Sequence, residues 1–80
     1  MTVKEAVVAR FKEILKERNM RPNELANISG VTPSTVYSML DGQRKEITIN
    51  VIKKLCDGLD MKLGEFFSAP IFNELEQEIR

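Results

Sequence analysis

The chain has 80 residues, with 12 basic and 12 acidic side chains, no histidine and one cysteine. A chain this short forms one domain and buries only about 60–65% of the surface that its unfolded form exposes. The balanced charge excludes the simplest signature of nucleic-acid binding, a strongly basic composition. Without histidine, Ser-His and Cys-His nucleophile pairs and the usual zinc sites cannot form, so we expect no enzyme, metal or cofactor.

The charges are unevenly distributed along the chain. Residues 1–21 carry six basic and three acidic groups, for a net +3, whereas residues 64–80 carry one basic and four acidic groups, for a net −3. We therefore expect the N-terminal part to approach a polyanion. Cys56 lies in an apolar helical pattern and is expected to be a buried, inert thiol, in keeping with a reducing cytoplasm.

The first apolar residues do not form a targeting or membrane segment. Lys4 and Glu5 interrupt them, and no apolar run approaches the roughly 20 residues that span a bilayer. We expect a cytoplasmic protein with no membrane partner.

The first predicted element is a helix over residues 3–18. Its apolar residues recur at spacings of three and four, which puts them on one stripe that faces the core. They are Val3, Val7, Phe11, Ile14 and Leu15, and the stripe ends at Arg18.

Residues 22–40 predict two short helices that cross at a large angle. Pro22 and Pro33 each suit a first helical position, where no N–H is needed, and Thr32 can cap the second helix. Gly30 suits the left-handed residue between them. The residues expected to be buried are Leu25, Ala26, Ile28, Val36, Met39 and Leu40.

Two further helices are predicted after the turn at Asp41-Gly42. Thr48 can cap the first, and the second is short, because Lys62 is a poor cap and Gly64 weakens a helix. Their apolar residues are Ile49, Ile52, Leu55, Cys56 and Leu59 in the first, and Leu63, Phe66 and Phe67 in the second.

A last helix is predicted from Pro70, in residues 69–80. Ile71, Phe72, Leu75 and Ile79 would share one side of it. Because roughly ten residues are marginal as an isolated helix, this stripe needs a surface that buries it. The body of the domain and the same segment of a second subunit are both open at this point.

The outer face of the helix predicted to start at Pro33 is small and polar. With Val36 pointing inward, Ser34, Tyr37 and Ser38 point outward, and Glu24 is the only charged residue between Pro22 and Leu40. Short hydroxyl side chains allow a helix to enter a major groove, and helix N-termini attract phosphate. The same pattern also fits a protein-interaction module of five helices.

The spacing of this segment resembles the Cro/C1-type helix-turn-helix family, also called the XRE family, of bacterial and phage regulators. The resemblance is carried by Glu24-Leu25-Ala26, by Ser29 to Tyr37 and by Leu40-Asp41-Gly42, and it extends over about residues 7–67. It implies a compact, all-α, five-helix, lambda-repressor-like domain over residues 1–68, with the motif at 22–40 and a helical extension over 69–80. It also implies a cytoplasmic, repressor-like transcription regulator that binds double-stranded DNA as a homodimer.

The resemblance also implies roles for individual residues. Base contacts would come from Pro33, Ser34, Thr35 and Ser38, and phosphate contacts from Arg21, Asn23, Thr32, Tyr37, Arg44 and Lys45. A homodimer could use Ile71, Phe72, Leu75 and Ile79.

The sequence departs from the family at the starts of the two helices of the motif. Relatives often have Ser-Gln at the first and a glutamine or arginine early in the second, whereas this chain has Arg21-Pro22 and Thr32-Pro33. Proline cannot donate a hydrogen bond, so a thymine methyl is the expected contact of Pro33. Each of these residues also has a structural interpretation that involves no DNA. The prolines can serve as helix starters, Thr32 as a cap, and Arg44 and Lys45 as solvated loop residues. The alternative function is an antitoxin-like or antirepressor-like partner of another protein.

Overall fold

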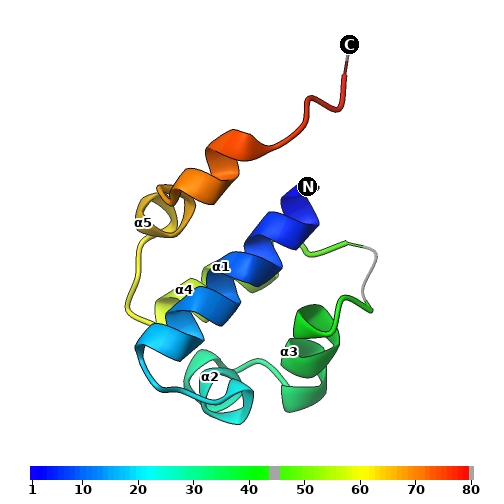
Figure 1. The fold of residues 1–80 in the computed structure, drawn as a ribbon. Helices are drawn as coiled ribbons and strands as arrows, with labels where there is room; N and C mark the ends of the chain where they lie inside the picture. Colours follow the sequence, from blue (N-terminus) through cyan, green and yellow to red (C-terminus); the bar gives the residue numbers. More distant parts are fainter. Residues whose placement is uncertain (44–45, 80) are drawn as a thin grey trace.

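The computed structural model describes residues 1–43 and 46–79 (Figure 1). These residues form five α-helices and one short 3₁₀ helix, with no strand among them. The elements are α1 (Val3–Glu17), α2 (Pro22–Ser29), α3 (Pro33–Leu40), α4 (Ile49–Gly58), α5 (Leu63–Phe67) and η1 (Pro70–Glu74). The predicted all-α class with five helices is confirmed.

In Figure 1, α1 runs across the molecule, with α2 and α3 below it and α5 above it. It starts with a capping box. The Thr2 hydroxyl accepts a hydrogen bond from the Glu5 N–H (3.2 Å), and the Glu5 carboxylate accepts one from the Thr2 N–H (3.0 Å). These bonds to Thr2 lower the pKa of Glu5, because they favour its charged form.

The boundaries of α2 and α3 follow the local signals in the sequence. Gly30 ends α2 in the left-handed region, with φ 67°. The Thr32 hydroxyl caps α3 by accepting a hydrogen bond from the Thr35 N–H (3.4 Å). Gly42, with φ 73°, follows the end of α3. Thr48 caps α4 in the predicted way, accepting from the Val51 N–H at 3.3 Å.

The core lies between α1 and the other helices and is centred on two aromatic rings. The rings of Phe11 and Phe66 have centroids 4.5 Å apart, and both side chains are fully buried. The other buried residues are Ala6, Val7, Ile14, Leu15, Leu25, Ala26, Val36, Met39, Leu40, Ile52, Leu55, Cys56 and Leu59. Most of the predicted core is therefore confirmed, and Ala6 joins it.

Three residues predicted to be buried are exposed instead. The exposed fraction is 47% for Val3, 48% for Ile28 and 56% for Ile49. Val3 and Ile49 are the first residues of α1 and α4, where the helix has not yet reached its neighbours. Ile28 lies about 110° around α2 from the middle of the buried face that Leu25 and Ala26 form, so it points to the side of the helix and away from the core.

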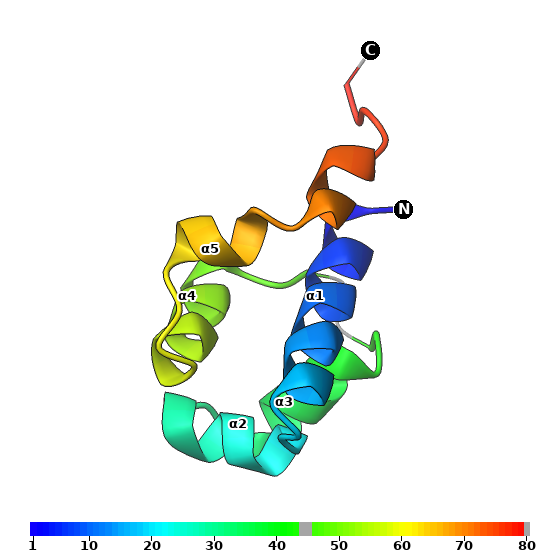
Figure 2. The same ribbon diagram turned by 60° about the vertical axis from the view of Figure 1, so that its left-hand side comes forward.

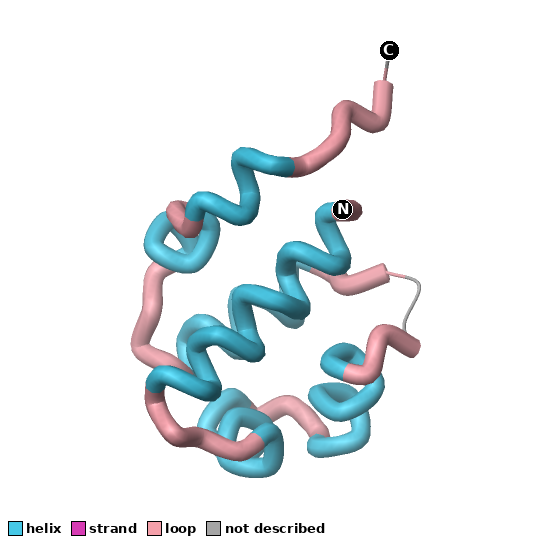
Figure 3. The backbone as a smooth tube through the Cα atoms, viewed as in Figure 1, coloured by secondary structure: helices cyan, strands magenta, loops and turns pink. Residues whose placement is uncertain are grey.

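The predicted C-terminal helix is wrong beyond its first turn. The helical turn ends at Glu74, and the chain from Leu75 onward is irregular (Figure 3). Phe72 packs on its own domain, with its ring 5.8 Å from that of Phe66 and 4.9 Å from that of Phe67. Ile79, by contrast, is 83% exposed, so the predicted apolar stripe does not stay together. Without a surface along its whole length, a helix this short is not stable.

No helix in residues 1–43 and 46–79 has both the length and the apolar character needed to cross a membrane.

Candidate nucleic-acid interface

A close backbone contact with α4 holds α2 in place. A Cβ added at Gly58 would lie 2.9 Å from the Ser29 Cα and 3.0 Å from the Ile28 carbonyl oxygen. The Ser29 hydroxyl lies in the same contact, buried and without a hydrogen-bond partner. Only glycine fits here, and the position of α2, against which α3 packs, depends on it.

The four predicted base-contacting residues fall into two pairs. Pro33 and Ser34, in the first turn of α3, are exposed. Thr35 and Ser38 are half-buried: the Thr35 hydroxyl lies 2.8 Å from the Thr32 hydroxyl, and the Ser38 hydroxyl donates to the Thr35 carbonyl oxygen (3.1 Å). Pro33 and Ser34 are thus the residues most open to a ligand.

Thr35 is turned toward the protein more than the sequence pattern indicated. It borders a small cavity of about 30 Å³ together with Met39 and Val51. Thr35 lies about 40° around α3 from the buried Met39 and about 100° from the buried Val36, so it lies at the edge of the buried face.

The predicted phosphate-binding residues at α2 lie on the surface. Arg21 is the N-cap residue of α2 and Asn23 lies in its first turn, and both are exposed. The Arg21 N–H donates to the Glu24 carboxylate (3.3 Å), which occupies one backbone donor at this helix start. Lys16, from the last turn of α1, borders the same open hollow of about 450 Å³ as Arg21 and Glu24.

Lys16 is a cation that the sequence reasoning did not select. Its signal was its place near the end of the predicted first helix, shortly before Arg21. The structure brings these two cations to the edge of one hollow at the start of α2.

The remaining predicted phosphate contacts belong to α3 and its flanks. Thr32 is exposed, and its hydroxyl serves as the cap, so the structural reading of Thr32 is confirmed. Tyr37 is 42% exposed. Arg44 and Lys45 lie outside the described residues.

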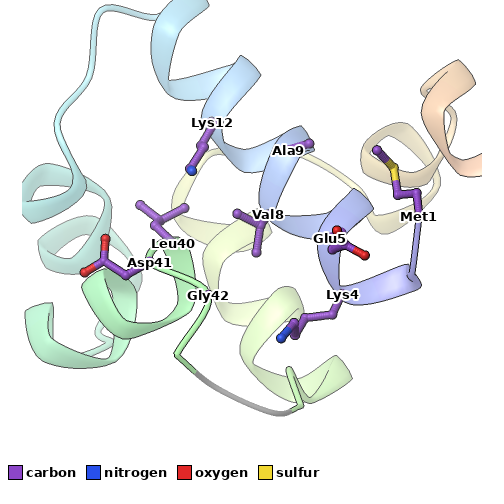
Figure 4. Close-up of a pocket in the computed structure, with 9 residues that line it drawn as sticks. All are labelled: Met1, Lys4, Glu5, Val8, Ala9, Lys12, Leu40, Asp41 and Gly42. Carbon is purple, nitrogen blue, oxygen red and sulfur yellow. The ribbon is translucent and has the colours of Figure 1, made fainter.

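Elsewhere, a hollow of about 540 Å³ lies between α1 and the end of α3 (Figure 4). Its ionisable side chains are two lysines and two carboxylates, from Lys4, Lys12, Glu5 and Asp41. In the part of the chain that the structure describes, no three potential metal ligands gather. Burial raises the pKa of the Cys56 thiol, and Asp57 adds to the effect, so the thiol stays protonated.

A search of curated proteins and of solved structures found no significant match. The family profile described as the Cro/C1-type HTH DNA-binding domain does match, over residues 10–70. The matched region contains α2, the turn at Gly30 and α3, together with the core helices that hold them. The chain therefore belongs to the Cro/C1-type helix-turn-helix family of DNA-binding domains.

Proposed function

We propose that this protein is a sequence-specific transcription regulator of the repressor type, which places α3 in the major groove and binds its operator as a homodimer. Membership of a DNA-binding family supports binding to DNA. The observation that carries the finer proposal is the exposed first turn of α3, where Pro33 and Ser34 are open and no charged side chain intervenes.

Ser34 is the principal reader in this proposal. Its exposed hydroxyl lies 3.4 Å from that of Thr32 and can both donate and accept a hydrogen bond, so it can meet a base edge. Pro33 has no N–H to donate, and its ring supplies apolar contact for a thymine methyl. Ser38 and Thr35 make secondary contacts with bases at the edge of this surface, because each hydroxyl already has a contact within the protein.

Phosphate binding is assigned to the start of α2 and to its neighbours. The positive end of the α2 dipole and the cations Arg21 and Lys16 lie at this edge of the molecule. Asn23 and Tyr37 are exposed and can donate hydrogen bonds to phosphate oxygens. Arg44 and Lys45, which follow α3 in the sequence, are the remaining cations of the proposed phosphate contacts.

The proposed dimer follows from the small size of the DNA-reading surface. One recognition helix contacts a single half-site, and a two-fold axis places a second about 34 Å away on the same face of the duplex. We expect an operator that is a palindrome or close to one.

The test is selection of binding sites from random duplex DNA, followed by affinity measurements on the enriched sequence. Ser34→Ala should weaken specific binding by about five- to tenfold, which is roughly the loss of one hydrogen bond to a base. Ser68→Ala is the matched control, because Ser68 is exposed, lies after α5 and donates only to the Glu65 carbonyl oxygen in the structure.

Two results would contradict the proposal: no enriched sequence, or equal affinities for Ser34→Ala and Ser68→Ala. The salt dependence gives a second reading. Few cations lie near α2 and α3, so the logarithm of the affinity should fall only modestly with the logarithm of the salt concentration. Arg21→Ala should reduce the slope of this dependence by about one. A slope that requires ten phosphate contacts would be incompatible with this surface.

A further inference from the structure

An apolar groove lies beside the N-terminus, on a part of the molecule that the proposed DNA-reading surface does not use. It has a volume of about 380 Å³ and is formed by the starts of α1 and α4, the residues before α4 and the end of α5. Its apolar lining is Val3, Val7, Ile47, Ile49, Ile52 and Phe67. Val3 and Ile49 are about half exposed there, so the groove leaves apolar surface in contact with water.

The C-terminal residues 75–79, here called the arm, provide the second unpartnered feature. The arm rises away from the body of the domain in both ribbon views (Figures 1 and 2). Ile79, near its end, is the most exposed large apolar residue of those described, at 83%. A branched aliphatic side chain in this position gains free energy when a partner surface covers it.

The arm and the groove begin at the same place on the molecule. The Glu76 carboxylate lies 3.8 Å from the N-terminal amine, and Glu78 borders a hollow with Thr2, Val3 and Lys4. Val3 and Lys4 also line the apolar groove. The arm therefore passes the mouth of the groove without filling it, and its end points away from the domain (Figure 1).

Residues 75–79 are acidic, and one edge of the groove carries a lysine. The arm carries Glu76 and Glu78, and Glu74 precedes it. Lys4 borders the groove and also lines the hollow between α1 and the end of α3 (Figure 4). Glu46 is the acidic residue in the groove lining, on the other side from α1, so the arm's carboxylates fit best at the Lys4 edge.

We infer that the arm of one chain binds in the groove of a second copy, with Ile79 covered by the apolar lining and Glu78 beside Lys4. Because arm and groove are adjacent in each chain, one two-fold axis brings each arm to the other chain's groove. Such a reciprocal contact closes at two subunits and leaves no free arm. The inference rests on the proposed function, because it specifies the dimer that a palindromic operator requires.

This arrangement differs from an interface made by the predicted C-terminal stripe. Phe72, which that stripe included, already covers Phe66 and Phe67 of its own domain. The contact between arm and groove also leaves α2 and α3 free, since neither helix contributes to the groove.

The experiment is sedimentation equilibrium of the full chain without DNA, with circular dichroism to confirm that each variant is folded. Ile79→Asp should weaken self-association by at least about tenfold, because it replaces the covered aliphatic group by a charge. Ile28→Asp is the matched control, since Ile28 is an exposed isoleucine on α2, away from the groove, and should leave the dimer unchanged.

A charge exchange tests the partner assignment. Lys4→Glu and Glu78→Lys should each weaken the dimer by about two- to fivefold, and the double variant should recover most of the loss. The inference is overturned if the wild-type chain is a monomer up to millimolar concentration. It is also overturned if Ile79→Asp and Ile28→Asp associate equally, or if the double variant shows no recovery.

Shift assays on the selected DNA separate this inference from the proposed function. If Ile79→Asp is monomeric and still binds one half-site with dependence on Ser34, both proposals stand. If a selected sequence is bound with dependence on Ser34, while substitutions in the arm and in the groove leave self-association unchanged, only the present inference fails. If no sequence is selected although the arm mediates a dimer, only the proposed function fails.

Discussion

Residues 22–40 and residues 70–79 have similar sequence signals, yet they fold differently. In both segments a proline occupies the start of a helix, and apolar residues follow at helical spacing. The first segment forms two α-helices with the predicted bounds, whereas the second forms one 3₁₀ turn and then an extended arm. The comparison shows that helical spacing specifies a stable helix only where a surface buries the apolar side.

Two features of residues 22–40 are missing from the C-terminal segment. Thr32 gives α3 a side-chain cap, whereas the cap position before η1 is Ala69, which has none. The apolar sides of α2 and α3 also contribute fully buried side chains to the core that they share with α1 and α4, while in η1 only partly buried side chains, such as Phe72, contact the core. A segment of about ten residues without these supports is marginal.

The largest expected effect is a loss of stability when a buried side chain of α2 is shortened. Leu25→Ala should lower the free energy of unfolding by about 2–5 kcal/mol, because Leu25 is fully buried and its removal leaves a cavity. Phe72→Ala is the matched change in the C-terminal segment and should cost only about 1–2 kcal/mol, since Phe72 is half-buried. Urea denaturation at one fixed protein concentration measures both. Equal losses would contradict the comparison.

The next effect concerns the contact that fixes α2. Gly58→Ala forces a methyl group against Ser29 and Ile28, and such overpacking costs about 1–3 kcal/mol, reduced by the roughly 1 kcal/mol that alanine gains in a helix. Gly64→Ala is the control, because nothing lies within 4 Å of its added Cβ, and it should be neutral or stabilising. Gly58→Ala should therefore unfold at a lower temperature than Gly64→Ala, and equal unfolding temperatures would contradict this account.

Loss of the α3 cap should have a smaller effect. Thr32→Ala removes the hydroxyl that accepts from the Thr35 N–H, and the expected loss is about 1 kcal/mol of unfolding free energy. Thr32→Ser keeps the hydroxyl and should retain most of that stability. If the serine variant were as unstable as the alanine variant, capping would not explain the start of α3.

The smallest effect should come from adding a cap to the C-terminal segment. Ala69→Ser places a hydroxyl at the N-cap of η1, with an expected gain of at most about 1 kcal/mol in local stability. Hydrogen exchange of residues 71–74, measured on dilute monomeric protein, should become slower, while exchange of residues 75–79 stays fast because no element of the same chain covers them. Slow exchange throughout 71–79 would mean that a missing cap, and not a missing surface, had kept the segment from forming a helix.

The candidate DNA-binding surface could be predicted from the sequence only in outline. The sequence indicated that Ser34 and Ser38 both point outward, and by angle they do lie on the outer side of α3. It could not indicate that the Ser38 hydroxyl donates to the Thr35 carbonyl oxygen, or that Lys16 borders the same hollow as Arg21. Hydrogen bonds to the backbone and contacts between separate helices depend on three-dimensional positions that spacing does not encode.

The sequence by itself determined the helices that local chemistry specifies. Pro22, Gly30, Thr32 and Thr48 place helix starts and ends through backbone angles and capping bonds, which act within a few residues. Only the tertiary structure decided which apolar residues are buried at the margins. Ile49 and Ile79 fit their helical patterns, yet they stay exposed because no neighbouring element of the same chain reaches them. Burial depends on a neighbouring element, and the spacing of apolar residues within one segment does not show whether such a neighbour is present.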